Sequence, residues 1–555
     1  MSLEIRYYDI PDGAQDDMHV SAEGQNVVSV PPVLSTGATK KAYATLEPGV
    51  WVLDGTREIL PDAPELGFWS QKLSGSDGQF VDPPVIILEF DNVYSSTGIT
   101  FAFSPATEQW CNEIRVTWYN ANAILAQGVF YPTNANWILN KTVESFDRIR
   151  VELISTNLPQ NFAKIERIEI GQTITFGAEE LKNARLVNEI DPTLCELSAD
   201  MMSFEVVDSQ NRNLIPQESQ MIELIKDGAI EAVHYITSSD KEHGSRYLFS
   251  GQSIIGLLEG TFMGGIYKDK PVSDLLSEVL GEVEFDLHSK FSDVTVTGYI
   301  PILSQRNALQ QIAFAIGAII TTRGGRKIRF VPIPTSTSAR FSVKDIFLGG
   351  KVKSEPRIAK VEVTSHSYTL SDEEETLMQE EEISGSNLLL TFPEPHHSYS
   401  VTGGTILSSD ANWVRIDVDG PVTLKAKKYH HNTITHSKRN AKATAKEQGN
   451  VISVTEATLV NNANAQKTLD RLYDAYLLRK KVEQQVTVSN QRAGQLATTV
   501  TPWDTLVNGM IFSMDSQFTQ KTHIASIELH GVEIPAESVS LFSGDIYSGE
   551  TEALY

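Results

Sequence analysis

The chain has 555 residues, which is far more than one ordinary domain and predicts three to five domains. Hydrophobic residues make up 41% and charged residues 21% of the chain, a composition typical of a globular protein that excludes intrinsic disorder. The formal net charge of −25 argues against stable nucleic-acid binding, because neutralising phosphates needs clustered Lys and Arg.

The chain also lacks the usual signals for membranes and export. No run approaches the roughly 18 apolar residues that span a bilayer, so no membrane span is predicted. The N-terminus has neither the basic start nor the apolar run of a secretory signal, so we expect the protein to stay where it is made, or to leave by cell lysis or as part of a particle. Cys111 and Cys195 define no disulfide framework and no metal-ligand spacing, and we expect both to be buried.

Residues 1–175 are predicted to form a β-sandwich, because short apolar runs alternate there with turn-forming residues. Five of the seven tryptophans lie in this region. Trp118 alternates with Val116 and Ile114 and is expected in the core. Trp110 and Trp137 are candidates for a platform under a sugar ring, although burial in the core is the favoured interpretation for any single Trp.

Residues 176–262 are predicted to form a first β-barrel. Its strongest local signal is Asp227-Gly228 between two apolar runs, a pair that predicts a tight hairpin. Residues 263–340 are predicted to form a helix-rich middle with a hairpin. Ser304 is a candidate N-cap, the apolar residues after it lie on one helix face, and Gly317 has the place of a helix stop.

The hairpin of this middle region turns at Arg323-Gly324-Gly325-Arg326. It carries no catalytic group. Arg323, Arg326 and Arg329 are candidates for contacts with a neighbouring acidic subunit, and ordinary solvated hairpin charge is the alternative.

Residues 341–550 are predicted to form a second β-barrel with a long helix over residues 463–485. The helix has an apolar stripe that includes Leu469, Leu472 and Tyr476, and basic residues near its C-terminal end. An acidic tract over residues 372–382 lacks the ligand spacing of a Ca²⁺ loop and is predicted to be a loop exposed to solvent or to a lumen.

Five histidines are concentrated in this last region. Neighbouring histidines on a strand point to opposite sides, so three or four ligands do not obviously converge. We therefore predict no metal site and interpret the group as surface or interface residues: His396, His397, His430, His431 and His436.

No catalytic motif was found in the chain. It has no G-x-S-x-G elbow, no H-E-x-x-H helix and no P-loop, and neither cysteine has the local sequence of a cysteine peptidase. The two carboxylates of a glycosidase cannot be recognised from their spacing in a sequence. The last predicted barrel ends near residue 545, however, and the roughly ten residues after it leave no room for an appended hydrolase domain. We expect a non-enzymatic protein without cofactors.

Several segments resemble known families. Four segments resemble, in this order, the tail or baseplate hub proteins of bacteriophages. They are KPVSDLLSEVLGEV, then LSQRNALQQIAFAIGAIITTRGGRKIRFVPIP, then NNANAQKTLDRLYDAYLLRKKVEQQVTVS, and finally WDTLVNGMIFSMDS. SSTGITFAFSP, EIRVTWYN and FDRIRVELISTNLPQNFAKIERIEIG resemble the discoidin-like, carbohydrate-binding modules of prophage tail proteins.

The resemblance implies a mainly β fold with α elements: an N-terminal sandwich, followed by a hub of two β-barrels bridged by a helix and hairpin module. It implies a homotrimeric ring at the tail tip or baseplate of a virion, made in the host cytoplasm, with a channel for DNA. The implied partners are a distal tail or tube protein, a tape-measure protein, and a spike or fibre.

Two alternatives remain open at the level of sequence. The first is an adhesin that binds host cell-wall or other surface polysaccharide through residues 1–175. The second, ranked last, is an enzyme that degrades polysaccharide.

Overall fold

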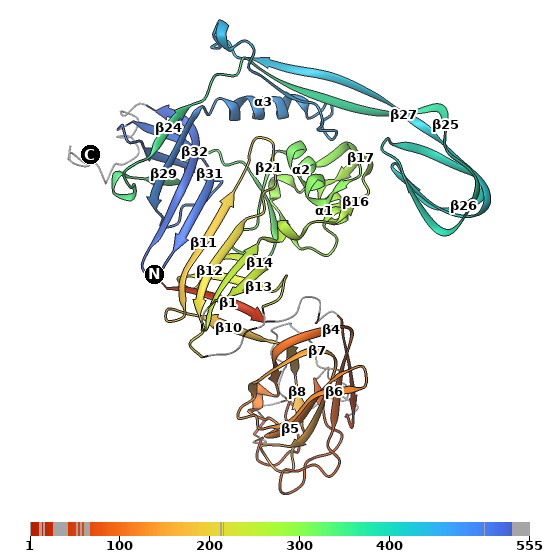
Figure 1. The fold of residues 1–555 in the computed structure, drawn as a ribbon, viewed down its shortest axis with the longest axis vertical. Coiled ribbons are helices and arrows are strands. Elements are labelled where there is room, and N and C mark those ends of the chain that lie inside the picture. Colours follow the sequence, from red (N-terminus) through yellow and green to blue (C-terminus); the bar gives the residue numbers. More distant parts are fainter. Residues whose placement is uncertain are drawn as a thin grey trace.

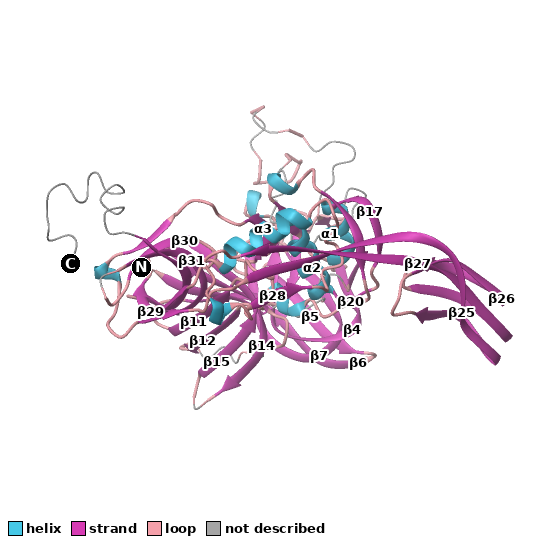
Figure 2. Ribbon diagram, turned by 90° about the horizontal axis from the view of Figure 1, so that it is seen from above, coloured by secondary structure: helices cyan, strands magenta, loops and turns pink. Residues whose placement is uncertain are grey.

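The structure is a computed structural model, and it describes residues 2–9, 14, 17–25, 43–51, 54–55, 58–59, 67–210, 214, 216–242, 244–503 and 505–534. The fold is mainly β with some α, as the sequence predicts. Figure 1 shows four parts: a sandwich, one large sheet, a helix-bearing module, and an arm of long strands that extends to one side. The view from above in Figure 2 shows the same arm projecting from the body.

The sandwich is built on a sheet with the strand order β2-β4-β7-β5-β6, in which β9 also pairs with β4. A short pair, β3 with β8, lies across the core from it. Trp118 is 1% exposed within this core, which confirms its predicted burial. The strands are β2 (Met18–Glu23), β3 (Phe68–Trp69), β4 (Val85–Ala102), β5 (Glu113–Asn120), β6 (Ala123–Phe130), β7 (Asn136–Ser155), β8 (Lys164–Ile165) and β9 (Arg167–Ile170).

The two predicted barrels share one 13-stranded sheet. We call its two parts the first half and the second half, and each wraps its own hydrophobic core. The first half contains β1 (Leu3–Asp9), β10 (Gln172–Phe176), β11 (Leu181–Glu189), β12 (Met201–Val207), β13 (Met221–Lys226), β14 (Ala229–Lys241) and β15 (Arg246–Gln252). The second half contains β23 (Ala339–Phe341), β24 (Lys351–Ser354), β29 (Lys480–Thr487), β30 (Leu496–Val500), β31 (Leu506–Phe518) and β32 (His523–Ile534).

The first strand of the chain does not belong to the sandwich, to which residues 1–175 were assigned. β1 pairs with β10 on one edge and with β13 on the other. The physical reason is the strict alternation of this strand, which buries Leu3, Ile5 and Tyr7 in the core of the first half. The N-terminus therefore lies beside the lower ends of β31 and β32 in Figure 1, where Gln520 Nε2 donates to the Leu3 carbonyl at 2.8 Å.

The predicted hairpin of the first half is confirmed. β13 and β14 pair antiparallel across Asp227 and Gly228, whose φ angles are 51° and 80°. Two consecutive positive φ values are what a type I′ turn requires, and its twist matches that of the flanking strands.

The helix-bearing module follows β15 and has a core of its own. Its elements are β16 (Thr261–Phe262), β17 (Gly265–Pro271), α1 (Val272–Leu280), β18 (Phe285–Leu287), β19 (Thr295–Ile300), β20 (Leu303–Ser304), α2 (Gln305–Ile316), β21 (Ala318–Thr321) and β22 (Ile328–Pro332). The predicted cap is present, because the Ser304 side chain accepts from the Asn307 amide at 3.2 Å. Gly317 ends α2 with a φ of 75°, as predicted.

The last helix is shorter than predicted and packs elsewhere. α3 (Ala465–Tyr476) ends nine residues before residue 485, because the chain from Lys480 onward pairs as β29 with β24 and β32. Leu469 and Leu472 of α3 belong to the core of the helix-bearing module rather than to that of the second half. The apolar stripe is therefore real, but α3 packs against β25 and β27 at the base of the arm.

The arm consists of β25 (Lys360–Thr391), β26 (His396–Asp410) and β27 (Trp413–Arg439), with β28 (Val451–Val454) paired to its base. The acidic tract predicted to be a loop is part of β25. Three of its carboxylates pair with lysines of β27, since Asp372 contacts Lys427 at 2.8 Å, Glu374 contacts Lys425 at 2.9 Å, and Glu375 contacts Lys428. This cross-strand ladder offsets the low β propensity of the acidic tract.

The far part of the arm folds back toward the module. It has a small core around Val414, Ile416 and Leu424. Asn412, which is fully buried, donates from Nδ2 to the Tyr299 hydroxyl of β19 at 2.6 Å. Among the described residues, no helix combines the length and apolar character that a bilayer crossing needs.

The structure also describes five short 3₁₀ helices. They are η1 (Pro105–Thr107), η2 (Ile254–Leu257), η3 (Ser289–Phe291), η4 (Val343–Asp345) and η5 (Ala445–Glu447). Ser342 and Thr444 each begin one of them with a capping box that ends on an acidic side chain.

Candidate functional site

The junction between the two halves of the sheet is the feature that the sequence does not show. β11 pairs antiparallel with β31, from Ala184 opposite Phe518 to Glu189 opposite Ser513. Arg185 reinforces it with a two-pronged contact to Asp515, since both hydrogen bonds measure 2.7 Å. The pairing removes two free strand edges and fixes one half of the sheet against the other.

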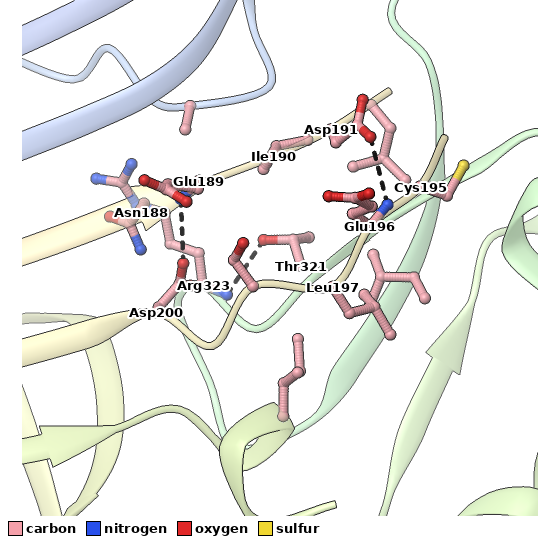
Figure 3. Close-up of a pocket in the computed structure, with 15 residues that line it drawn as sticks. Asn188, Glu189, Ile190, Asp191, Cys195, Glu196, Leu197, Asp200, Thr321 and Arg323 are labelled. Atoms are coloured by element: carbon pink, nitrogen blue, oxygen red, sulfur yellow. Dashed lines mark hydrogen bonds between the residues drawn. The ribbon is translucent and has the colours of Figure 1, made fainter. Parts of the chain in front are cut away.

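The helix-bearing module meets both halves beside this junction (Figure 3). The end of β11, the loop over residues 190–200 and the segment after β21 surround a cavity of about 20 Å³. Asp200 Oδ1 accepts from the Glu189 amide at 3.3 Å, and the Asp191 carboxylate accepts from the Glu196 amide at 3.5 Å. The cavity has room for about one water molecule, so it is a packing feature and holds no cofactor.

Arg323 is the cation at the centre of this junction. Its side chain is 11% exposed and forms an ion pair with Glu231 of β14, which is equally buried. Burial and the nearby charge of Arg492 lower the pKa of Arg323 to about 9, so the side chain stays charged at neutral pH. Arg492 Nη2 of the second half lies 4.0 Å from Glu231 Oε2. One carboxylate thus faces cations from the module and from the second half.

Asp200 predicts a pH dependence of stability. Burial raises its pKa to about 6, despite hydrogen bonds from Asn188, the Glu189 amide and Thr322. The folded protein therefore binds a proton at Asp200 more tightly than the unfolded chain. The stabilisation is fully present below the ordinary pKa of about 3.9 and is lost as the pH rises through 6. Between pH 7 and pH 4, protonation of Asp200 adds about 2–3 kcal/mol to the free energy of unfolding. We expect Asp200→Asn to remove this contribution.

Urea denaturation at several pH values, followed by circular dichroism, checks this expectation. The exposed Asp293, replaced by Asn, is the matched control and leaves the wild-type slope unchanged. An Asp200→Asn protein with the wild-type slope would contradict the assignment.

The other two hairpin arginines have partners within the chain. Arg326 is 57% exposed, lies 3.3 Å from Glu223 and sits 5.5 Å from the centre of the Tyr8 ring. Arg329 is 42% exposed and lies 3.5 Å from Asp286. Their role as contacts to a neighbouring subunit stays a prediction, and Arg323 offers the least free surface of the three.

The two tryptophan candidates of the sandwich are half-buried. Trp110 and Trp137 both pack against the sandwich core, Trp137 with its ring centre 6.0 Å from that of Phe101. The Trp110 amide donates to Asn157 Oδ1 at 3.0 Å. Sugar binding at these two residues stays a prediction.

A buried ion pair lies in the same sandwich and was not predicted. Lys164 Nζ is 2.5 Å from Glu47 Oε2, and both side chains are 1% exposed. Gln109 accepts from the same ammonium at 2.7 Å, and the ammonium lies 4.1 Å from the centre of the Trp69 ring. The network attaches residues 43–51 to the sandwich. Its only signal in the sequence is a lysine within the apolar run Phe162 to Ile165.

The five predicted histidines are spread over the arm. His396 Nδ1 is 2.9 Å from the Glu394 carbonyl, and His436 Nε2 is 3.0 Å from the Ser365 hydroxyl. His431 Nε2 lies 2.9 Å from Nδ1 of His366. Within the described residues, no three His, Cys, Asp or Glu side chains gather as metal ligands would.

Both cysteines are buried thiols. Burial raises the pKa of Cys111 far above its ordinary value and that of Cys195 to about 11. A nucleophilic cysteine needs a lowered pKa, so neither thiol is activated.

The residues of the junction could not be identified from sequence. Asp200 lies in a polar loop, and Glu231 interrupts an apolar strand in a way that solvent-facing residues also do. The only hint was the pair of arginines around Gly324 and Gly325, which the sequence placed correctly in a turn but assigned to an outer surface.

Neither the protein-family models nor the curated protein sequences compared with this chain give a match. The structure is similar to bacteriophage and prophage tail proteins, as the resemblance in the sequence predicts. One is the 43 kDa tail protein of prophage MuSo2 from Shewanella oneidensis, at 10% identity and a TM-score of 0.41 over 64% of this chain and 95% of that one.

Two further structures have similar values. The tail protein from Neisseria meningitidis MC58 has 12% identity and a TM-score of 0.41 over 64% of this chain and 93% of that one. The prophage tail protein gp18 from Listeria monocytogenes EGD-e has 10% identity and a TM-score of 0.37 over 66% of this chain and 94% of that one.

Proposed function

We propose that the protein is a structural component of a bacteriophage or phage-like tail, and that it acts as the hub of the tail tip or baseplate. The observation that carries the proposal is the edge-to-edge joining of two barrel-like half-sheets within one chain through β11 and β31. A pair of similar units placed side by side is the element from which rotation builds a closed ring.

The proposed assembly is a homotrimer whose six half-sheets form the ring. Among the described strands, β24 ends the sheet on the side of the second half and pairs on one edge only, so it offers an edge to a neighbouring copy. The order of the four hub-like segments in the sequence supports the same assembly. The net charge of −25 suits a channel through which DNA slides without binding.

The proposed partners are a distal tail or tube protein, a tape-measure protein, and a spike or fibre. No catalytic activity is part of the proposal. The proposed location of the protein is the virion, at the tail tip or baseplate.

We expect the purified protein to have three times the mass of one chain by native mass spectrometry, or to reach that state when mixed with its tube partner. The physical reason is burial of strand edges and apolar faces between copies. Particles that lack the protein should have no tail, or a tail that is defective at its tip. A monodisperse monomer under both conditions would contradict the proposal.

A second proposed function is binding of host-surface polysaccharide through the sandwich, which would make the protein an adhesin as well. The resemblance of residues 85–171 to carbohydrate-binding modules supports it. The candidate platforms are Trp110 and Trp137. Replacing either by Ala in the full chain should weaken binding of host-surface polysaccharide.

A further inference from the structure

A cleft of about 550 Å³ lies where the sandwich meets the first half of the sheet. One wall comes from β4 and β7 of the sandwich, and the other from β10 and the turn after β12. Figure 1 shows the sandwich below β1 and β10, the strands of the first half that lie nearest to it. Its volume is within the range of pockets that bind small molecules.

The cleft contains unused hydrogen-bonding groups. Five of its side chains are at least partly exposed and make no hydrogen bond to another described residue: Asn140, Thr142, Thr173, Thr175 and Gln210. Two further polar residues at its floor, Thr97 and Gln172, are buried and bond to each other at 2.9 Å. The polar groups of the floor thus bond to each other, while the walls offer amide and hydroxyl groups to a ligand.

The lining also lacks charge. Among the described residues that line the cleft, none has an ionisable side chain. A charged ligand would lose its hydration there without gaining a counter-charge, which is unfavourable. A neutral ligand that carries donors and acceptors on several sides would gain hydrogen bonds from both walls. Ile138, which is 40% exposed, adds an apolar surface for the C–H face of a sugar ring.

An extended peptide fits the cleft less well. β10 has a free backbone edge there, and a peptide strand could pair with it. Specific strand addition, however, also needs apolar pockets for alternate side chains. Among the described residues of the lining, only Ile138 and the buried Ile174 are apolar. The neutral polar walls on both sides favour a polyhydroxylated ligand.

We propose that this cleft is the site at which the protein binds a neutral saccharide of its host surface. The proposal rests on the second proposed function, since it supplies a ligand class and a place for glycan binding. It differs in the residues, because neither Trp110 nor Trp137 lines the cleft. It does not depend on the trimeric hub.

The test uses isothermal titration of the full-length protein with neutral hexasaccharides of glucose, galactose, mannose and N-acetylglucosamine, and with an anionic hexagalacturonate. We expect at least one neutral hexasaccharide to bind and the anionic one not to bind. Asn140→Ala with Gln210→Ala should weaken binding by about 10-fold or more, since each change removes a hydrogen bond worth about 1 kcal/mol. The exposed Asn134→Ala is the matched control and should bind like the wild type.

Methyl NMR of the isoleucines gives a second readout that does not rely on a variant. Saccharide should shift the methyl signal of the half-exposed Ile138 and leave that of Ile86, buried in the sandwich core, unchanged.

Three outcomes would overturn the proposal, and they differ in what else they affect. Loss of binding in Trp110→Ala or Trp137→Ala, with full binding in the cleft variant, would overturn the cleft and keep the adhesin. No binding of any neutral saccharide would overturn both. Binding of an extended Thr–Val peptide or of hexagalacturonate in place of the neutral sugars would overturn the ligand class.

Discussion

We expect Arg323→Met to destabilise the junction by about 3–5 kcal/mol, because it leaves the buried Glu231 carboxylate without its nearest cation. Arg492 lies at the 4.0 Å limit of an ion pair with Glu231 and replaces only part of the lost interaction. Asp200 loses a stabilising charge at the same time, so its pKa rises further. Both effects act where the module and the two halves of the sheet meet.

Hydrogen exchange measured by mass spectrometry locates this effect. Peptides that cover residues 186–200 and 318–332 should exchange faster in the variant, while peptides of the sandwich stay unchanged. The control on the same hairpin is Lys327→Met. The Lys327 side chain is 45% exposed and pairs with the exposed Glu284, so its loss should cost less than about 1 kcal/mol.

A double variant separates a lost charge pair from lost packing. Arg323→Met combined with Glu231→Gln removes the uncompensated charge and should recover more than half of the stability. If the double variant were as unstable as Arg323→Met alone, packing of the guanidinium and not its charge would explain the effect.

Lys164→Met should be equally costly within the sandwich. The change leaves the Glu47 side chain fully buried, with neutral donors from Gln109 and the Phe162 amide but no cation, which we expect to cost about 3–5 kcal/mol. Because the ammonium lies over the Trp69 ring, tryptophan fluorescence during urea denaturation reports this transition directly. Residues 43–51 should detach first, which limited proteolysis detects.

The matched control is Lys72→Met, which breaks an ion pair to Asp82 in which both side chains are more than 70% exposed, and it should leave the transition nearly unchanged. Glu47→Gln added to Lys164→Met should recover much of the loss, since Gln keeps an acceptor for the Phe162 amide. A Lys164→Met protein as stable as the wild type would show that the pair adds nothing to the fold.

Local structure was predictable wherever the determinants are close in sequence. The cap at Ser304, the stop at Gly317 and the turn at Asp227-Gly228 all depend on residues within one or two turns of chain. Their interactions are governed by backbone conformation, which a short segment already restricts. Trp118 was placed correctly because strand alternation assigns a side chain to one face.

The errors concern partners that are distant in sequence. β1 joins strands that begin at Gln172 and Met221, and nothing in its own seven residues identifies them. The acidic tract forms a strand because lysines about 50 residues later lie opposite its carboxylates. Arg323 is buried because Glu231 and Asp200 surround it, whereas the sequence shows only a charged turn.

The junction also has a consequence for the order in which the protein forms. Arg185 and Asp515 are separated by 330 residues, so the edge of β11 stays unpaired until almost the whole chain has been made. At about 5–20 residues per second, synthesis of the intervening chain takes on the order of 20–60 s. During that interval the first half of the sheet is an open template, and β31 from another nascent copy is a chemically identical partner. Expression yield should therefore depend on how many ribosomes translate one message, with dense polysomes favouring copies that have exchanged this strand.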